Sequence, residues 1–215
     1  MKHPLFEEID KFRVWSKGFS ELPEEERWGE WEEEYEHWDR IESAFADFIR
    51  STNVEDWTNA ISTALLYIIA RDNESETLAD LVSEYPEKLV FLAQQAVNAE
   101  SPTSKWLLTI RLPRLSDKKL AESLLLDFID NSDEYVRRRT LMSLAQVGSS
   151  QTEHYCKKAW QRSDPYQEYQ RMMVLHALFE IKSPLLQQYI EEAKRDGRRY
   201  LVENAVDIER RVRTA

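Results

Sequence analysis

The sequence predicts an all-α protein built from stacked pairs of helices. Two windows, residues 130–147 and 164–181, match each other at a separation of 34 residues. A fixed period of this length is typical of repeat architectures, in which each unit buries its apolar face against its neighbours. Only 4 glycines occur in 215 residues, and the long segments between short polar turns are helix-forming in composition. Six positions are identical between the windows: Asp130/Asp164, Glu134/Glu168, Tyr135/Tyr169, Arg137/Arg171, Leu141/Leu175 and Leu144/Leu178.

The first elements expected are two helices of unequal length. Residues 5–15 have an amphipathic pattern, and Gly18 is placed to end that helix. Pro23 then opens a long helix that extends to about Arg50, because proline is tolerated in a first turn. Apolar side chains recur in this second helix at spacings of three and four, which predicts one packed face: Trp28, Trp31, Tyr35, Trp38, Phe45 and Ile49.

The middle of the chain predicts four further helices. Asn53 is placed to cap the first of them, which presents an apolar face from Trp57 to Ile68. A loop over residues 72–75 separates it from a short helix that ends near Val82. The remaining two are expected from Pro86 to about Ala99, and from Ser101 to Pro113.

The last part of the chain predicts a regular series of helices. Asp117 is placed to cap the helix before the first matched window. Each window forms one helix, followed by a second helix over residues 150–162 or 184–195. After Gly197, a final helix is expected to pack through one stripe of side chains, Leu201, Ala205, Ile208 and Val212.

Residues 130–148 read D-N-S-D-E-Y-V-R-R-R-T-L-M-S-L-A-Q-V-G. This segment resembles the first helix of a HEAT or HEAT-like repeat, whose pattern runs from an acidic turn through V-R to L-x-x-L/V-G. The second copy keeps Arg171 but has Gln170 in place of Val and Lys182 in place of Gly. The resemblance covers about residues 100–196 and implies a HEAT-like α-solenoid of about five antiparallel helix pairs that offers a binding surface. The matching positions are Asp133, Val136, Arg137, Leu141, Leu144, Val147 and Gly148.

The sequence also predicts a repeated ion pair and the division of the chain into domains. Arg137 and Arg171 are expected to reach the acidic turn before their own helices, which would make an Asp–Arg link worth about 1 kcal/mol that repeats along the chain. We expect a single helical-repeat domain over residues 1–215, with acidic, Trp-rich N-terminal helices in 1–50 and helical repeats in 51–215. The composition change near residue 100 is the one candidate seam.

The net charge of −11 is unevenly placed, since residues 1–100 carry 9 Lys/Arg against 24 Asp/Glu and residues 101–215 carry 20 against 16. An acidic half attracts a basic partner and repels nucleic acid and anionic lipid, although charged blocks also serve solubility alone. The aromatic stripe of residues 23–50 is expected to pack while its glutamates face water, and the same segment is a candidate docking surface. The predicted partner-binding residues are Trp28, Glu32, Glu33, Glu36 and Asp39.

The sequence predicts no catalytic residues, no cofactor and no metal site. The four histidines, among them His176, lack the i, i+4 spacing of a helical zinc site, and His176 is expected to be a satisfied core residue. The single cysteine, Cys156, excludes an internal disulfide framework and is expected to be small and buried. Neither a secretory signal nor a membrane span is predicted, so a reducing cytoplasm is the simplest location.

These observations favour a non-catalytic protein-binding module. The form we expect is a bacterial immunity-type protein that binds and neutralises a basic, nuclease-like toxin domain. One alternative is a scaffold or adaptor protein with HEAT-like repeats. Another is a nucleic-acid-binding solenoid that resembles some DNA glycosylases, although the acidity of the chain makes nucleic acid an unlikely partner. This last alternative would depend on Arg111, Arg114, Lys118, Lys119, Arg137, Arg138 and Arg139, with Trp106 and Trp160.

Overall fold

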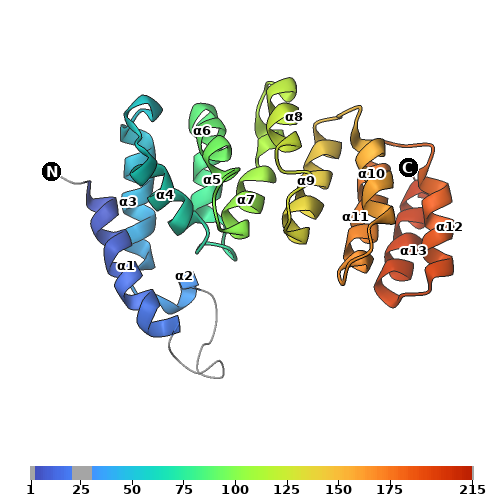
Figure 1. The fold of residues 1–215 in the computed structure, drawn as a ribbon, viewed down its shortest axis with the longest axis horizontal. Helices are drawn as coiled ribbons and strands as arrows, with labels where there is room; N and C mark the ends of the chain where they lie inside the picture. Colours follow the sequence, from blue (N-terminus) through green and yellow to red (C-terminus); the bar gives the residue numbers. More distant parts are fainter. Residues whose placement is uncertain (1–2, 21–30, 215) are drawn as a thin grey trace. The chain divides into compact units, whose positions relative to one another are not determined.

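The computed structural model describes residues 3–20 and 31–214, and over these residues the chain is helical without any β-strand (Figure 1). The all-α prediction is therefore confirmed. The chain divides into two compact units, residues 1–111 and residues 112–215. Their boundary lies close to the composition change near residue 100.

The N-terminal unit contains seven α-helices within its described residues. The first helix, α1, packs against α3 and α4, and α3 also packs against α5. The fourth helix contacts α6 and α7, which contact each other. The bounds are α1 Pro4–Ser20, α2 Trp31–Glu34, α3 Trp38–Ser51, α4 Asn59–Ile69, α5 Thr77–Ser83, α6 Pro86–Ala96 and α7 Pro102–Thr109, with a 3-10 turn at Val54–Asp56.

The long helix predicted from Pro23 to Arg50 is not continuous in its described portion. The helical pattern stops after α2 and resumes at α3, with Tyr35 between them. Tyr35 and Trp38 are both buried, and their ring centroids lie 5.2 Å and 5.6 Å from that of Phe12 in α1. The helix therefore breaks where Tyr35 and Trp38 pack against Phe12, and the periodicity of the sequence does not indicate this break.

Of three predicted helix ends, two differ from the structure and one is confirmed. Gly18 lies inside α1 instead of ending it. Thr58, not Asn53, caps α4, because its side-chain oxygen accepts the Ile61 N–H at 3.4 Å. The prediction for Asp117 is confirmed, since its carboxylate accepts the first backbone N–H groups of α8 at 3.0 Å.

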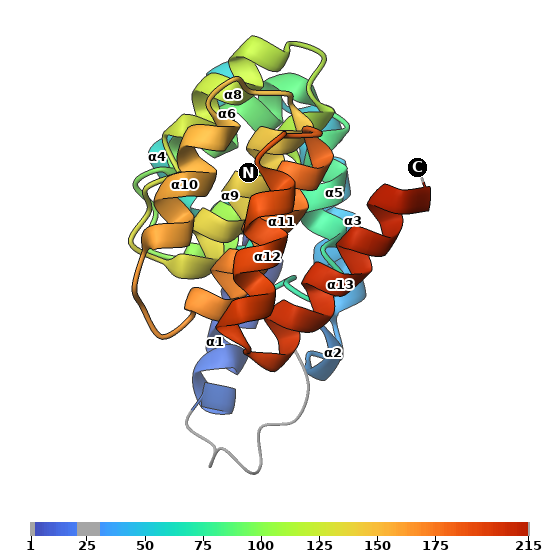
Figure 2. The same ribbon diagram turned by 90° about the vertical axis from the view of Figure 1, so that its right-hand side faces the viewer.

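The described part of the C-terminal unit, residues 112–214, contains six α-helices. Helix α11 packs against α9, α10, α12 and α13, and Figure 2 shows α12 and α13 beside it. The helices of the two matched windows, α9 and α11, are therefore neighbours in space. The bounds are α8 Lys118–Leu126, α9 Glu134–Gln146, α10 Thr152–Gln161, α11 Gln167–Glu180, α12 Leu186–Asp196 and α13 Arg199–Thr214, with a 3-10 turn at Leu112–Arg114.

The two windows also end in the same way. Gly148 after α9 and Lys182 after α11 both take the left-handed conformation, with φ of 71° and 52°. The next residue in each case, Ser149 or Ser183, donates its backbone N–H to a carbonyl five residues earlier, at 3.1 Å and 2.9 Å. This is the Schellman arrangement, and Lys182 therefore occupies a position that ordinarily favours glycine.

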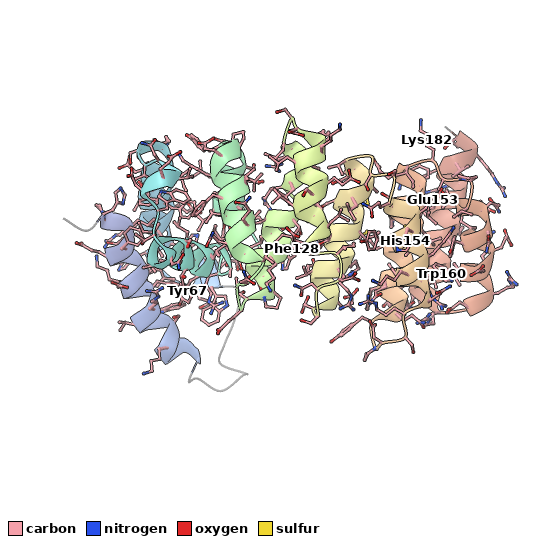
Figure 3. All side chains as sticks on the ribbon, turned by 45° about the horizontal axis from the view of Figure 1, so that its top comes forward. Tyr67, Phe128, Glu153, His154, Trp160 and Lys182 are labelled. Carbon is pink, nitrogen blue, oxygen red and sulfur yellow. The ribbon has the colours of Figure 1, made fainter. Side chains whose placement is uncertain are left out.

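The serines that follow these turns repeat a second contact. The Ser183 hydroxyl donates to Glu153 Oε1 at 2.6 Å, and the Ser149 hydroxyl donates to Glu122 in the same manner. Lys182 and Glu153 consequently lie near each other at one end of the helices (Figure 3). The 34-residue match in the sequence thus corresponds to a repeated set of backbone and side-chain contacts.

The apolar rows of the repeat form the core of the C-terminal unit. Leu144, Leu175 and Leu178 are fully buried and Leu141 is almost so. The matched leucine positions predict this burial. Burial of such apolar side chains supplies most of the stabilisation of a helix pair. The stripe predicted for the last helix is buried at Leu201, Ala205 and Ile208, whereas Val212 near the chain end is exposed.

Candidate functional site

Glu32 differs from the other predicted partner-binding residues in its burial. Glu33, Glu36 and Asp39 are exposed, but Glu32 retains only 8% of its accessible surface. Its Oε1 atom accepts the backbone N–H groups of residues 74 and 75 at 2.8 Å and 3.2 Å. The expectation that Glu32 faces water is therefore wrong, because this carboxylate ties α2 to the loop between α4 and α5. Trp28 lies outside the described residues.

The aromatic side chains beneath α2 and α3 belong to the core. Tyr35 and Trp38 expose only 6% and 7% of their surface, and Tyr35 also contacts Trp15 with 5.0 Å between ring centroids. Phe45 and Ile49 are fully buried farther along α3. The packing expected of this stripe is therefore present in its described part, and the rings fix the side of α2 and α3 that turns outward.

The outward side forms what we call the α2–α3 acidic surface, which consists of Glu33, Glu34, Glu36 and Asp39. In the described part of the chain, no hydrogen bond or ion pair engages Glu33, Glu34 or Asp39. Glu36 lies 3.2 Å from the Nε2 atom of the adjacent His37. These carboxylates remain open to an external cation.

The two units differ strongly in charge. Residues 1–111 carry 11 Lys/Arg against 24 Asp/Glu, a net charge of −13, whereas residues 112–215 carry 18 against 16, a net charge of +2. In the C-terminal unit many carboxylates are paired with arginine or lysine, among them Asp130, Asp164, Asp196 and Glu209. Unpaired negative charge is therefore concentrated on the N-terminal unit.

The predicted Asp–Arg link exists in the repeat, but its direction is the reverse of the one expected. Arg137 donates to the carbonyls of Asn131 and Ser132 at 2.9 Å and 2.7 Å, in the turn before its helix. Its carboxylate partner is Asp164, at 3.1 Å, the first residue of the next window, in the turn before α11. Arg171 likewise donates to the Trp160 carbonyl before its helix and pairs with Asp196, the last residue of α12.

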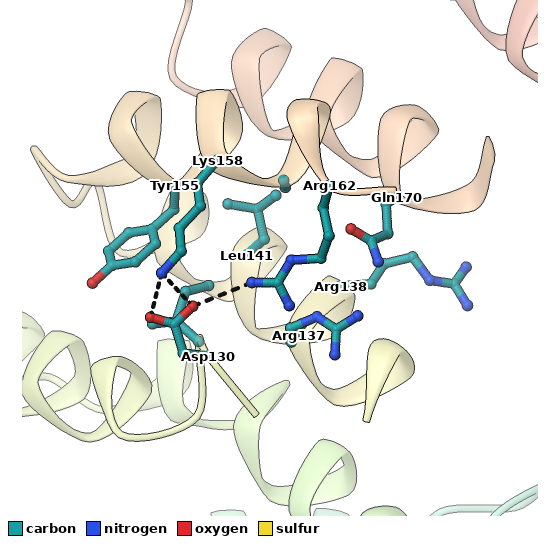
Figure 4. Close-up of a pocket in the computed structure, with 10 residues that line it drawn as sticks. Asp130, Arg137, Arg138, Leu141, Tyr155, Lys158, Arg162 and Gln170 are labelled. Atoms are coloured by element: carbon teal, nitrogen blue, oxygen red, sulfur yellow. Dashed lines mark hydrogen bonds and ion pairs between the residues drawn. The ribbon is translucent and has the colours of Figure 1, made fainter. Parts of the chain in front are cut away.

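Asp130, in the acidic turn before α9, is engaged by other cations. Lys158 contacts both of its carboxylate oxygens at 2.7 Å, and Arg162 approaches at 3.4 Å (Figure 4). Asp130 and Arg162 line a small cavity together with Arg137 and Arg138. Its volume of about 20 Å³ is roughly that needed for one water molecule. The cluster therefore links successive helices and has no room for a substrate.

Electrostatic effects in this network follow from partial burial. Burial and the neighbouring Arg162 lower the pKa of Arg137 from its ordinary value. At the far end of the repeat, hydrogen bonds from Arg198 lower the pKa of Asp196 to about 2, because they stabilise the ionised carboxylate. These shifts accompany structural ion pairs.

Several of the basic residues considered for nucleic acid are engaged within the fold. Arg138 pairs with Glu134 at 3.1 Å and stacks on Tyr135, with 4.7 Å between the guanidinium carbon and the ring centroid. Lys118 donates to two backbone carbonyls. Arg111 belongs to the N-terminal unit, where it is 98% buried and pairs with two carboxylates. Trp106 and Trp160 are buried as well.

Cys156 and His176 have structural surroundings. Cys156 is fully buried, and burial raises the pKa of its thiol to about 12, so the reactive thiolate does not form near neutral pH. The His176 Nε2 atom lies 2.8 Å from Asn204 Oδ1, which satisfies the half-buried ring. Over residues 3–20 and 31–214, no group of three or more histidine, cysteine or acidic residues is arranged to hold a metal ion. No helix in the same ranges has the length and apolar character needed to cross a membrane.

Two residues of interest were not identified from the sequence. Asp72 is fully buried, and its carboxylate accepts the Leu78 N–H at 2.5 Å and the Ser75 hydroxyl at 2.6 Å. Arg71 stacks on Tyr67, four residues earlier, and on Trp31. The spacing of Tyr67 and Arg71 on one helix face is a signal that the sequence contains, whereas the contact with Trp31 depends on the tertiary fold.

Comparison with known proteins finds no matching family model and no matching curated sequence. Function must therefore be inferred from the residues and their geometry.

Proposed function

We propose that this protein is a non-catalytic, cytoplasmic protein-binding module of the immunity type, which binds and neutralises a basic, nuclease-like toxin domain. The α2–α3 acidic surface is the docking surface. The observation that carries the proposal is the exposure of Glu33, Glu34 and Asp39 without a described ion-pair partner, on a unit with a net charge of −13.

The physical basis is electrostatic complementarity. A surface of one sign attracts a partner of the opposite sign before contact and raises the rate of association. Carboxylates that already have partners would have to exchange one ion pair for another, whereas unpaired ones gain an interaction. A basic partner therefore gains more interaction energy by pairing with the α2–α3 acidic surface than with the paired carboxylates of the C-terminal unit.

The architecture that we propose is a HEAT-like solenoid of about five helix pairs within a single domain. The repeated Schellman turns at Gly148 and Lys182 support this architecture. So does the packing of α11 against both α9 and α13. Repeats of this kind present extended surfaces to partners, which agrees with a binding role.

The test is a charge reversal that spares the buried Glu32. A variant with Glu33→Lys, Glu36→Lys and Asp39→Lys should fold normally, because all three side chains are exposed. We expect it to lose at least about tenfold in affinity for a basic toxin domain encoded beside the gene, because repulsion replaces attraction. Binding is measured by surface plasmon resonance, and neutralisation by the survival of cells that express the toxin domain.

The matched control reverses three exposed carboxylates of the C-terminal unit, Asp127→Lys, Glu180→Lys and Glu203→Lys. It changes the net charge by the same amount and should retain binding and neutralisation. Equal losses in both variants would show that net charge alone matters and would contradict the assigned surface. Absence of tight binding to any neighbouring toxin domain would contradict the immunity function.

A scaffold or adaptor function is the alternative, and the presence of two compact units with different charge favours it. It predicts several partners of moderate affinity and no inhibition of a toxin. A nucleic-acid function has less support, because Arg111, Arg137 and Arg138 are engaged in internal ion pairs. A gel shift with duplex and single-stranded DNA at low salt tests it directly.

A further inference from the structure

A groove of about 880 Å³ lies within the N-terminal unit, a volume in the range of known ligand sites. It runs along α4 and is bounded on its other side by the end of α6 and the start of α7. Its lining is mixed: the apolar Leu66 lies among hydroxyl and amide side chains and two charged ones, Arg71 and Glu100. The polar side chains used below are Asn59, Tyr67, Arg71, Gln95 and Asn98.

Arg71 is the feature of this groove that requires an explanation. Its guanidinium stacks on Tyr67 and on Trp31, with 5.0 Å from the guanidinium carbon to each ring centroid. Its Nε atom is buried without a hydrogen-bond partner. Within the described residues, the side chain makes neither a hydrogen bond nor an ion pair. The charge is thus held in position by the two rings while its donors remain unused.

Two other arginines of the same unit, one buried and one stacked on a ring, do have carboxylate partners. Arg111 is more deeply buried, and it pairs with Glu76 and Asp80. Arg13 stacks on the same ring of Tyr67 at 4.8 Å, but it pairs with Asp10 and does not line the groove. Glu100 also lines the groove, but within the described residues it forms no ion pair with Arg71. The positioned guanidinium therefore fits recognition of an anion from outside.

The amide side chains along the walls of the groove can form hydrogen bonds with a peptide backbone. The side chains of Asn59, Gln95 and Asn98 make no hydrogen bond within the described chain. Each side-chain amide offers both a donor and an acceptor, as a peptide group does. Helix α4 rises about 15 Å from Asn59 to Ile69, which equals about four to five residues of extended chain, and Arg71 lies just beyond its end.

We propose that this groove binds an extended peptide segment of a partner protein and that a carboxylate of the segment pairs with Arg71. The carboxylate is either an acidic side chain or the free C-terminus, since both present the two oxygens that a guanidinium recognises. The site goes beyond the proposed docking function, because it selects an anion whereas the α2–α3 acidic surface selects cations. A module with both sites binds two chemically different segments.

The test uses three pools of hexapeptides that carry an uncharged fluorophore and an acetylated N-terminus. The first pool has a central glutamate and an amidated C-terminus, the second a central glutamine and a free carboxylate, and the third a central glutamine and an amide. The other positions vary among Ala, Ser, Leu and Val. Fluorescence polarisation with the full chain should show one of the acidic pools binding at least about tenfold more tightly than the neutral pool.

The variants assign this preference to the groove. Arg71→Gln should bind the acidic pools no more tightly than the neutral one, while the control Arg13→Gln keeps the preference. Gln95→Leu with Asn98→Leu should weaken binding of every pool, which keeps the proposal open to refutation if Arg71→Gln fails to fold. Thermal unfolding of each variant establishes that it is folded.

Three results would overturn the proposal: equal binding of all pools, an undiminished preference in Arg71→Gln, or undiminished binding in the Gln95/Asn98 variant. A fourth pool, with a central phosphoserine and an amidated C-terminus, adds a fourth such result: if it binds more tightly than either carboxylate pool, the anion is phosphate and the proposal is overturned. The Glu33, Glu36 and Asp39 reversal should leave the peptide preference intact. Failure of the groove and failure of the acidic docking surface are therefore separate outcomes.

Discussion

Asp72 and Cys156 show how the same physical effect acts on single residues in different units. Both side chains are fully buried, and burial raises both pKa values, because each anion loses its hydration. Asp72 keeps two hydrogen bonds to its carboxylate, which oppose the effect in part. Cys156 has a neighbouring Glu153, whose charge disfavours the thiolate further.

Cys156 should not react with thiol reagents while the protein is folded. The pKa of about 12 leaves almost no thiolate at neutral pH, and the sulfur has no exposed surface. We expect no labelling by dithionitrobenzoate in native buffer and one equivalent after denaturation in guanidinium chloride. Rapid labelling of the native protein would show that α10 opens around this residue.

Asp72 should make the stability of the N-terminal unit fall as the pH rises from about 4 to about 6. Its native pKa is about 6, compared with an ordinary value of 3.8, so the native state holds a proton in this interval that the unfolded state has lost. The contribution is fully present below pH 4 and is lost through pH 6. The shift of about two units corresponds to about 3 kcal/mol in the free energy of unfolding.

The measurement is urea unfolding of the wild type and of Asp72→Asn at several pH values. The difference in unfolding free energy, wild type minus variant, should decrease between pH 4 and pH 7. Parallel pH profiles for the two proteins would mean that Asp72 titrates at its ordinary pKa in the native state.

At the scale of helices, the two matched windows use the same turn with different residues. Gly148 has φ of 71° and Lys182 has φ of 52°, so both are left-handed. Lys182 carries a Cβ atom that disfavours this conformation, by roughly 1–2 kcal/mol. The Schellman hydrogen bonds and the contact between Ser183 and Glu153 hold the turn despite that cost.

Opposite substitutions at these two positions should have opposite effects on stability. Lys182→Gly should stabilise by about 1 kcal/mol, because it removes the backbone strain. Gly148→Ala should destabilise by about 1 kcal/mol for the same reason, and no atom within 4 Å obstructs the added Cβ. Chemical denaturation of both variants tests the pair. Destabilisation by Lys182→Gly would mean that the lysine side chain contributes more than its backbone conformation costs.

At the scale of the whole molecule, charge is separated between the two units, with −13 in residues 1–111 and +2 in residues 112–215. In the C-terminal unit, ion pairs such as Arg137–Asp164 and Arg171–Asp196 neutralise charge while they join successive helices. In the N-terminal unit, the carboxylates of the α2–α3 acidic surface are left for solvent or a partner. This asymmetry is the physical basis of the proposed function.

Salt should therefore weaken the binding of a basic partner. The screening length falls from about 10 Å at 0.1 M to about 3 Å at 1 M ionic strength, which suppresses steering between separated charges. We expect the association rate of the wild type to fall by about tenfold or more over this range. The Glu33, Glu36 and Asp39 reversal should show a much smaller decrease. An association rate independent of salt would contradict electrostatic docking.

The helical class, the repeat and most core positions could be predicted from the sequence, because they depend on local spacing. Leu144 and Leu178 are buried as their period predicts, and Asp117 caps its helix as expected. Gly18 does not end α1, and Asn53 does not cap α4, since a local signal for a helix end can be overridden by packing. The sequence predicts that this segment is acidic, but it does not distinguish the buried Glu32 from its exposed neighbours.

Contacts between distant segments were decided by the tertiary structure alone. Glu32 is buried because its carboxylate meets backbone N–H groups 42 and 43 residues away. Arg71 lies between Tyr67 and Trp31, from different helices, and Arg137 finds its carboxylate in the following turn instead of the preceding one. The sequence determined which residues are apolar, charged or turn-forming, and therefore the helices. The partners of each buried charge depend on how those helices pack, because a charge removed from water must find its hydrogen bonds wherever the fold supplies them.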